Sequence, residues 1–334
     1  MSASTSRIER FISNLRQNLK EGNYYEGHQE LRAIAIRLVK QKKHSRAIQL
    51  LYLGALELCQ YNQWGSVADL AAFMINIYVE EKLPVTSDNK ERVYDIFEKL
   101  SQATEYYPRV YESAIQWTIG EKHGVGDSQM HHIVGCIQRG KARYQEAEQH
   151  FLVGTAESPL ALGSMLFDWA ARTSPQHDLG LFIARGVLKY LALGWREAAC
   201  LCYKAFAAKM AQALPAELEE QHSDDQAVQS AFGPVYYCKT HVLFNFTQLL
   251  LLTVERSDGS PASDSTRILG QIRNQYGQAF GTNADTINEL LDIVGEKFFG
   301  IVVHRQQSLF DIVNSLFASP SQPQIENTSA EAMD

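Results

Sequence analysis

Four residues in one short stretch carry side chains that could do chemistry: His123, Asp127, His131 and His132. Asp127 and His131 are four residues apart, so on a helix they would share one face and could hold a metal ion. Asp127 can instead cap the helix that begins after it, while His131 packs or hydrogen-bonds across to a neighbouring repeat. We favour the second interpretation, which predicts structural roles and no metal site.

Other signatures of catalysis are missing from the sequence. It has no glycine-rich phosphate loop ending in Lys-Ser or Lys-Thr, no His-Glu-x-x-His zinc motif and no nucleophile elbow. The cysteines are odd in number and have neither zinc-site nor disulfide-framework spacing: Cys59, Cys136, Cys200, Cys202 and Cys238. We therefore expect reduced thiols, no catalytic residues, no cofactor, and a protein that acts by binding.

The elements that position these residues are predicted to be helices. Tyr24, His44 and Trp64 are 20 residues apart, and each stands near a helix start, a few residues before a small residue. The same signature returns at Tyr144 and Trp195. One helix and turn per 20 residues gives helix pairs of about 40 residues, within the span of helical repeat families. Stacked pairs share a continuous core, which predicts a solenoid.

The rest of the chain is predicted to be helical, with three exceptions. Residues 233–239 are rich in β-formers and predict a short hairpin or extended loop. The acidic segment 216–230 before them is typical of a solvated loop or ragged helix end, and the tail 319–334 should be disordered. Further helices are expected at about 88–100, 109–122, 128–139, 143–155, 159–172, 178–193, 195–213, 240–255, 264–280, 285–304 and 306–317.

The apolar segments and the charge distribution bear on where the protein acts and what it binds. The N-terminus has no apolar run typical of a secretory signal, and the most apolar stretch, residues 242–254, is shorter than the roughly 20 residues that span a bilayer. We therefore expect a cytosolic protein without membrane insertion. Residues 1–50 carry ten Lys or Arg and four acids, whereas the whole chain has a net charge of −7. Such asymmetry steers association with a charged partner, and the net charge argues against coating nucleic acid.

An ordered set of short stretches runs over roughly residues 8–317. They are Gly22-Asn23-Tyr24-Tyr25-Glu26-Gly27-His28-Gln29 with Leu31-Arg32 and Arg37; Gly54-Ala55-Leu56 and Ala68-Asp69-Leu70; Gly126-Asp127 with His131; Glu146-Ala147-Glu148 with His150-Phe151-x-x-Gly154; and Phe246-x-Gln248-Leu249-Leu250-Leu251-Leu252-Thr253. Together these stretches resemble the Golgi to ER traffic protein 4 family, a scaffold of the guided-entry pathway for tail-anchored membrane proteins. Gly27 and Ser128 depart from the family pattern, where Ala and Pro are usual, and the segment 216–230 looks unlike the family.

The resemblance implies an all-α, right-handed α-solenoid superhelix of tetratricopeptide-like helix pairs, with a small β-hairpin near 232–240. The N-terminal half, 1–155, would bind the ATP-bound dimer of an ArsA-like targeting ATPase. The C-terminal half, 156–318, would hold the N-terminal segment of a ubiquitin-like-domain protein. The scaffold would thereby connect the ATPase indirectly to co-chaperones and their tail-anchored clients.

Candidate contact residues follow for each half. For the ATPase they are Arg10, His28, Arg32, Arg37, Asp69 and Asn76. Asp69 could pair with a basic side chain of the ATPase, or it could instead cap or border the helix near Trp64. For the ubiquitin-like partner they are Tyr236, Tyr237, Phe244, Phe298, Phe299, Phe310 and Phe317. Phe310, Val313 and Phe317 form an i, i+3, i+7 stripe that could equally be internal core.

Three alternatives stay open from the sequence. The first is a helical-repeat adaptor subunit of another cytosolic complex, such as a proteasome-lid or signalosome-like subunit. The second is an enzyme on an α-solenoid that uses His123, Asp127 and His131. Nucleic-acid binding is a distant third, because basic residues do not alternate with the aromatic ones.

Overall fold

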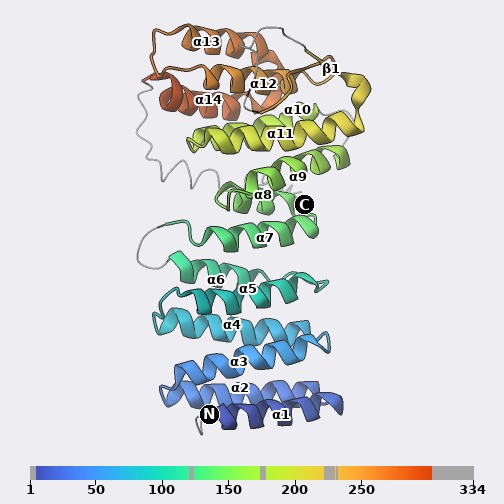
Figure 1. Cartoon of the computed structure of the whole chain (residues 1–334), viewed down its shortest axis with the longest axis vertical. Helices are drawn as coiled ribbons and strands as arrows, with labels where there is room; N and C mark the ends of the chain where they lie inside the picture. Colours follow the sequence, from blue (N-terminus) through green and yellow to red (C-terminus); the bar gives the residue numbers. More distant parts are fainter. Residues whose placement is uncertain (1–4, 120–123, 174–177, 222–229, 231, 303–334) are drawn as a thin grey trace, which may run out of the picture.

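The structure, a computed structural model, describes residues 5–119, 124–173, 178–221, 230 and 232–302. Helices dominate these residues, and they pile up along one long axis with the N-terminal helices at one end (Figure 1). The expected all-α solenoid is confirmed. The helices of the first part are α1 (Thr5–Lys20), α2 (Tyr24–Lys40), α3 (His44–Cys59), α4 (Trp64–Glu80), α5 (Ser87–Ser101), α6 (Pro108–Ile119) and α7 (Ser128–Gly140).

The second part continues the stack and ends in a thicker cap formed by its last three α-helices (Figure 1). Two short 3₁₀ helices, η1 (Pro215–Glu217) and η3 (Gly277–Asn283), join longer elements. The α-helices are α8 (Tyr144–Leu152), α9 (Ser158–Arg172), α10 (Leu179–Ala192), α11 (Arg196–Ala213), α12 (Val242–Glu255), α13 (Asp264–Tyr276) and α14 (Ala284–Phe299).

One turn type explains the 20-residue spacing. The residue two positions before the first residue of α2, α3, α4, α8 and α11 has a left-handed backbone, including Lys42 (φ +55°) and Ala142 (φ +57°). The next N–H donates to a carbonyl five residues back, as Lys43 does to Leu38 (2.9 Å). This is the Schellman pattern, which satisfies the last carbonyls of the preceding helix. After α2 and α3, which have 17 and 16 residues, this turn gives the 20-residue spacing of the helix starts.

Helices two positions apart lie side by side and are joined by polar contacts. Arg16 of α1 donates two hydrogen bonds to Glu57 of α3 (3.0 and 2.6 Å), a partner 41 residues away. Tyr52 of α3 donates to Asp95 of α5 (2.5 Å), 43 residues away. These separations match the predicted pair of about 40 residues. Odd-numbered helices therefore form one layer here, and the even-numbered helices form the other.

Two apolar clusters lie between the layers. One extends from Ile8 in α1 to Ile137 in α7, and the other extends from Ala147 in α8 to Phe299 in α14. In the second cluster α9 and α11 approach so closely at Gly163 that an added Cβ would collide with the carbonyl oxygen of Cys202. Close packing of this kind fixes how these two helices cross.

The only sheet among the described residues corrects the sequence prediction. Its strands are β1 (Leu218–Glu220) and β2 (Tyr236–Cys238), paired antiparallel with Leu218 opposite Cys238. The hairpin was expected within 232–240, but its first strand lies in the acidic segment expected to be a loop or ragged helix end. The three residues of β1 include two glutamates and show no sequence pattern typical of a strand. Their pairing depends only on backbone groups that face β2.

The expected helix 285–304 is too long at its C-terminal end. Helix α14 ends at Phe299 because Gly300 takes a left-handed backbone (φ +64°) and Ile301 N–H donates back to Gly295. The expected helix 306–317 and the tail 319–334 lie outside the described residues. No helix within the described ranges is long and apolar enough to cross a membrane. All five cysteines are unpaired thiols, three of them buried.

Candidate partner-binding surfaces

The first candidate surface lies where α2 and α4 are neighbours. His28 and Arg32 are four residues apart on one face of α2, and both reach Asp69 of α4. His28 Nε2 lies 2.9 Å from Asp69 Oδ2, and Arg32 Nη1 donates to Asp69 Oδ1. The Arg32 guanidinium also lies over the ring of Phe73, 5.7 Å from its centroid. We call these four residues the α2–α4 charged cluster.

Asp69 connects two helices of its own chain and does not cap one. Burial alone would raise the pKa of Asp69, but the hydrogen bonds from Arg32 and His28 outweigh it and hold that pKa below its usual value. The Asp69 side chain nevertheless keeps 37% of its surface exposed. A partner's cation can therefore reach the carboxylate, while His28 is buried and acts from behind it.

The other residues expected to contact the ATPase are exposed but do not all share one surface. Asn76 lies seven residues after Asp69, on the same side of α4, so its exposed amide can bind water or a partner. Arg37 follows Arg32 by five residues, which places it about 140° around α2. Arg10 is exposed on α1. The structure therefore brings part of the predicted set together and places Arg37 on another side of α2.

The histidine-rich stretch confirms the structural interpretation. Asp127 caps α7 by accepting the N–H of Met130 (3.0 Å), and it also accepts Lys90 Nζ (2.9 Å) and the Tyr94 hydroxyl (2.8 Å). Burial would raise the pKa of Asp127, but the Lys90 and Tyr94 hydrogen bonds outweigh it and lower that pKa. The carboxylate is thus fully occupied within the chain.

His131 makes the expected contact with the next helix. Its Nε2 lies 2.6 Å from the Val125 carbonyl oxygen, and its Nδ1 lies 2.8 Å from Nδ1 of His150 in α8. His123 lies outside the described residues. Where the chain is described, no group of three or more His, Cys, Asp or Glu residues could hold a metal ion.

The second candidate surface surrounds β2. Two amide side chains of α12 hold this strand on the helix. Asn245 accepts Cys238 N–H (2.9 Å) and donates to Cys238 C=O (2.6 Å), and Gln248 makes the same pair of bonds to Tyr236 (2.9 Å each). Gln248 also accepts the buried Tyr203 hydroxyl (2.9 Å). Because strand side chains alternate, Tyr237 points outward and is 46% exposed.

Two of the aromatic residues expected on this surface are instead core. Phe244 is fully buried against Tyr203 and Phe206 of α11, with ring centroids 5.3 and 6.4 Å away. Phe299 is fully buried as well. The prediction was wrong for both, because α12 and α14 lie inside the C-terminal cap and pack against several helices. Phe310 and Phe317 lie outside the described residues.

Tyr236, Tyr237 and Phe298 keep exposed surface, and the structure adds apolar residues that the sequence did not single out. Val242 and Leu249 are two turns apart on α12, and Ile268 lies across a groove on α13; all three are exposed. Leu249 and Ile268 line that groove together. The seven-residue spacing of Val242 and Leu249 could have indicated a shared helix face. Most residues of the run 242–254 are apolar, so this spacing did not stand out. We call Tyr237, Val242, Leu249 and Ile268 the C-terminal apolar surface.

Comparisons with known proteins agree with this architecture. The sequence model of the family described as Golgi to ER traffic protein 4 matches residues 41–317. Golgi to ER traffic protein 4 of Aspergillus fumigatus is 28% identical over 95% of this chain and 92% of its own length. The Homo sapiens homolog is 24% identical over 97% and 91% of the two chains.

A solved structure extends the similarity to three dimensions. The crystal structure of C. therm. Get4 matches with a TM-score of 0.75 at 26% identity, and the match covers 94% of this chain and 96% of that one. The family match covers α3 to α14, and the structural match covers 94% of the chain. The chain therefore belongs to the Golgi to ER traffic protein 4 family.

Proposed function

We propose that the chain is a non-enzymatic cytosolic scaffold that brings an ArsA-like targeting ATPase dimer, in its ATP-bound form, to a ubiquitin-like-domain protein. Family membership supports a role in Golgi-to-ER traffic, and the single observation that carries the proposal is the family match over residues 41–317. The two-layered solenoid supports it, because such a stack offers separate surfaces at its two ends.

The N-terminal half, 1–155, is proposed to dock the ATPase. The α2–α4 charged cluster offers a carboxylate and a guanidinium that are both partly exposed and already oriented by their mutual hydrogen bonds. Preorganised charges of opposite sign fix the orientation of a partner and give salt-dependent association. Asn76 adds to this surface on α4, whereas Arg10 on α1 and Arg37 on another side of α2 are proposed as further contacts of the same partner.

Charge reversal at Arg37 tests the N-terminal assignment most cleanly. Arg37 is exposed, and no ion pair to it is seen among the described residues, so Arg37→Glu should leave the melting temperature unchanged. We expect it to weaken binding of the ATP-bound ATPase at least tenfold at low salt, measured by calorimetry. Lys204→Glu on α11 is the matched control, because Lys204 is equally exposed in the other half. Equal affinities of Arg37→Glu and wild type would remove Arg37 from the interface.

Asp69 calls for a milder substitution than a charge reversal. A lysine there would face the His28 and Arg32 side chains, so reduced binding would be confounded by a weakened α2–α4 contact. Asp69→Asn keeps one of the two acceptor oxygens while removing the charge. We expect weaker ATPase binding with a small stability loss of about 1 kcal/mol. Unchanged binding by Asp69→Asn would make the cluster purely structural.

The C-terminal half, 156–318, is proposed to hold the N-terminal segment of the ubiquitin-like-domain protein. The C-terminal apolar surface exposes four large apolar side chains next to the only strand pair of the described chain, which favours an apolar segment as ligand. The other two expected contacts, Tyr236 and Phe298, are half-buried and are not part of the C-terminal apolar surface.

Leu249→Asp tests the C-terminal assignment. It should reduce binding of the ubiquitin-like-domain protein at least tenfold and leave ATPase binding unchanged. Val85→Asp is the matched control, because Val85 has similar exposure in a loop of the N-terminal half. Loss of both interactions in Leu249→Asp would indicate misfolding, and loss of neither would refute this surface.

A further inference from the structure

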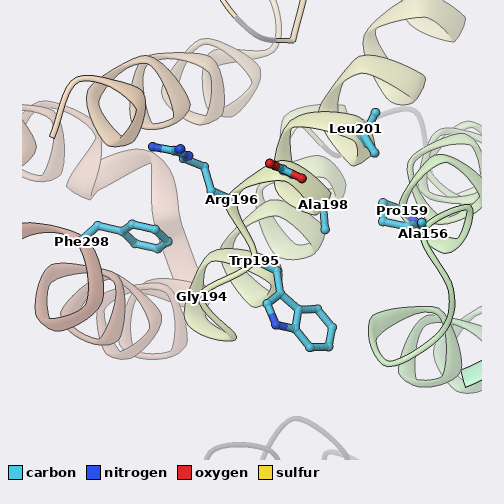
Figure 2. A pocket seen from close by; sticks show the side chains of 9 residues that line it. Ala156, Pro159, Gly194, Trp195, Arg196, Ala198, Leu201 and Phe298 are labelled. Carbon is cyan, nitrogen blue, oxygen red and sulfur yellow. The ribbon is translucent and has the colours of Figure 1, made fainter. Parts of the chain in front are cut away.

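An apolar groove in the C-terminal half contains none of the four residues of the C-terminal apolar surface and shares only Phe298 with the residues expected to contact a partner. It lies between the start of α9, the α10–α11 turn and the last turn of α14, and encloses roughly 530 Å³. Pro159, Trp195, Ala198, Leu201 and Phe298 supply most of its apolar wall. Figure 2 shows Trp195 on the central turn, with Pro159 to one side and Phe298 to the other. We call this feature the Trp195 groove.

The indole of Trp195 is held in place although it is 45% exposed. Its backbone N–H closes the Schellman turn by donating to Tyr190 C=O (2.9 Å), and its ring lies 6.4 Å from the Tyr190 ring. An exposed tryptophan beside other apolar side chains is uncommon on a protein surface, and it indicates a contact that covers it.

The chain itself continues from the rim of this groove. Phe298 lines the groove, α14 ends one residue later, and the last described residue is Val302. Gly300 reverses the backbone, so Ile301 packs back against Gly295 of α14. Whatever follows Val302 therefore starts beside the groove.

The following sequence has the right composition to fill it. Within residues 306–317, Phe310, Val313 and Phe317 form one helical stripe, flanked by Leu309, Ile312 and Leu316. The family match runs to residue 317, so this segment belongs to the shared protein and not to a variable tail. Phe310 is eight residues after Val302, and a chain of that length can span up to about 28 Å, enough to reach the groove.

We propose that residues 306–317 pack the Phe310, Val313 and Phe317 stripe into the Trp195 groove of the same chain. The short tether supplies a high effective concentration, on the order of millimolar, so modest intrinsic affinity suffices. Such packing covers Trp195 and gives the C-terminal repeat its missing neighbour. In this arrangement Phe310 and Phe317 would contact their own chain. The family resemblance implied instead that they contact a partner.

Hydrogen–deuterium exchange of the full chain tests this packing directly. We expect amides of residues 306–317 to exchange at least tenfold more slowly than those of a synthetic peptide of the same sequence. Trp195→Ala and Leu201→Glu, which alter only the groove, should each abolish most of that protection. Val85→Ala, at an exposed site in the other half, should leave it unchanged.

Three results would overturn the proposal. Exchange of the segment as fast as in the free peptide would mean that it does not fold onto the chain. Protection that survives both groove substitutions would place the segment elsewhere. Protection that falls on dilution would assign the groove to a second copy. None depends on the ATPase or the ubiquitin-like-domain protein, so the outcome is independent of the proposed function.

Discussion

Acidification should weaken the protein through the two histidines that join α7 and α8. His131 Nε2–H donates to Val125 C=O, so its Nδ1 has a free lone pair and accepts the Nδ1–H of His150. A second proton on His131 would set two N–H groups against each other at 2.8 Å. The hydrogen bond therefore requires a neutral His131, and burial disfavours a charge on His150.

The size of the effect follows from the pKa of His150. Burial, reinforced by His131, lowers that pKa from 6.5 to about 3. Between these values the unfolded chain binds a proton that the folded chain does not, so the free energy of unfolding falls as the pH drops below 6.5. At about 1.4 kcal/mol per pH unit, lowering the pH from 7.5 to 5.0 costs about 2 kcal/mol at this one site.

A conservative variant isolates this contribution. The side-chain amide of His150→Asn keeps an N–H near the position of Nδ1 but does not titrate. Urea unfolding followed by circular dichroism at pH 7.5 and 5.0 should show that wild type loses about 2 kcal/mol more than the variant. His132→Asn serves as a control, because His132 contacts the Ser158 hydroxyl and is not part of the His131–His150 pair. Equal acid sensitivity of wild type and His150→Asn would refute the neutral pair.

Three further predictions concern the packing of the solenoid. Ala142→Gly should raise the free energy of unfolding by about 1 kcal/mol in urea titrations, because the left-handed turn strains any residue with a Cβ; a loss of stability would contradict the turn assignment. Gly163→Ala should lower the melting temperature by several degrees, because its Cβ collides with Cys202 C=O, and an unchanged value would mean that α9 and α11 are less closely packed. Glu148→Ala should cost about 3 kcal/mol by leaving the arginine and lysine of α10 unpaired beside a buried site, whereas a loss below 1 kcal/mol would show that water replaces the carboxylate.

Helix starts were largely predictable from the sequence because the periodic signal is local. Tyr24, His44, Trp64 and Tyr144 each begin a helix, and Trp195 directly precedes one. The left-handed turns between these helices could not be predicted from the sequence in the same way. Lys42 and Ala142 adopt a left-handed backbone that glycine would have signalled, and only the helix packing imposes it.

The candidate surfaces were less predictable because exposure depends on distant elements. The sequence places Phe244 near the β-forming segment, but only the positions of α10 and α11 decide that it is buried. Gln248, an amide in an apolar run, gave a clearer sign, since a buried polar group requires a partner. That partner, the backbone of β2, is twelve residues away and pairs with a strand that has no sequence signature.

The central claim is that one chain binds both partners at once on separate surfaces. Size-exclusion chromatography with light scattering, on the chain mixed with the ATP-bound ATPase dimer and the ubiquitin-like-domain protein, measures this directly. The account predicts a single species whose mass equals that of all three components together, and it predicts that Arg37→Glu removes only the ATPase and Leu249→Asp only the other partner. Two binary complexes that exclude each other, or a chain that binds neither partner while folded, would contradict it.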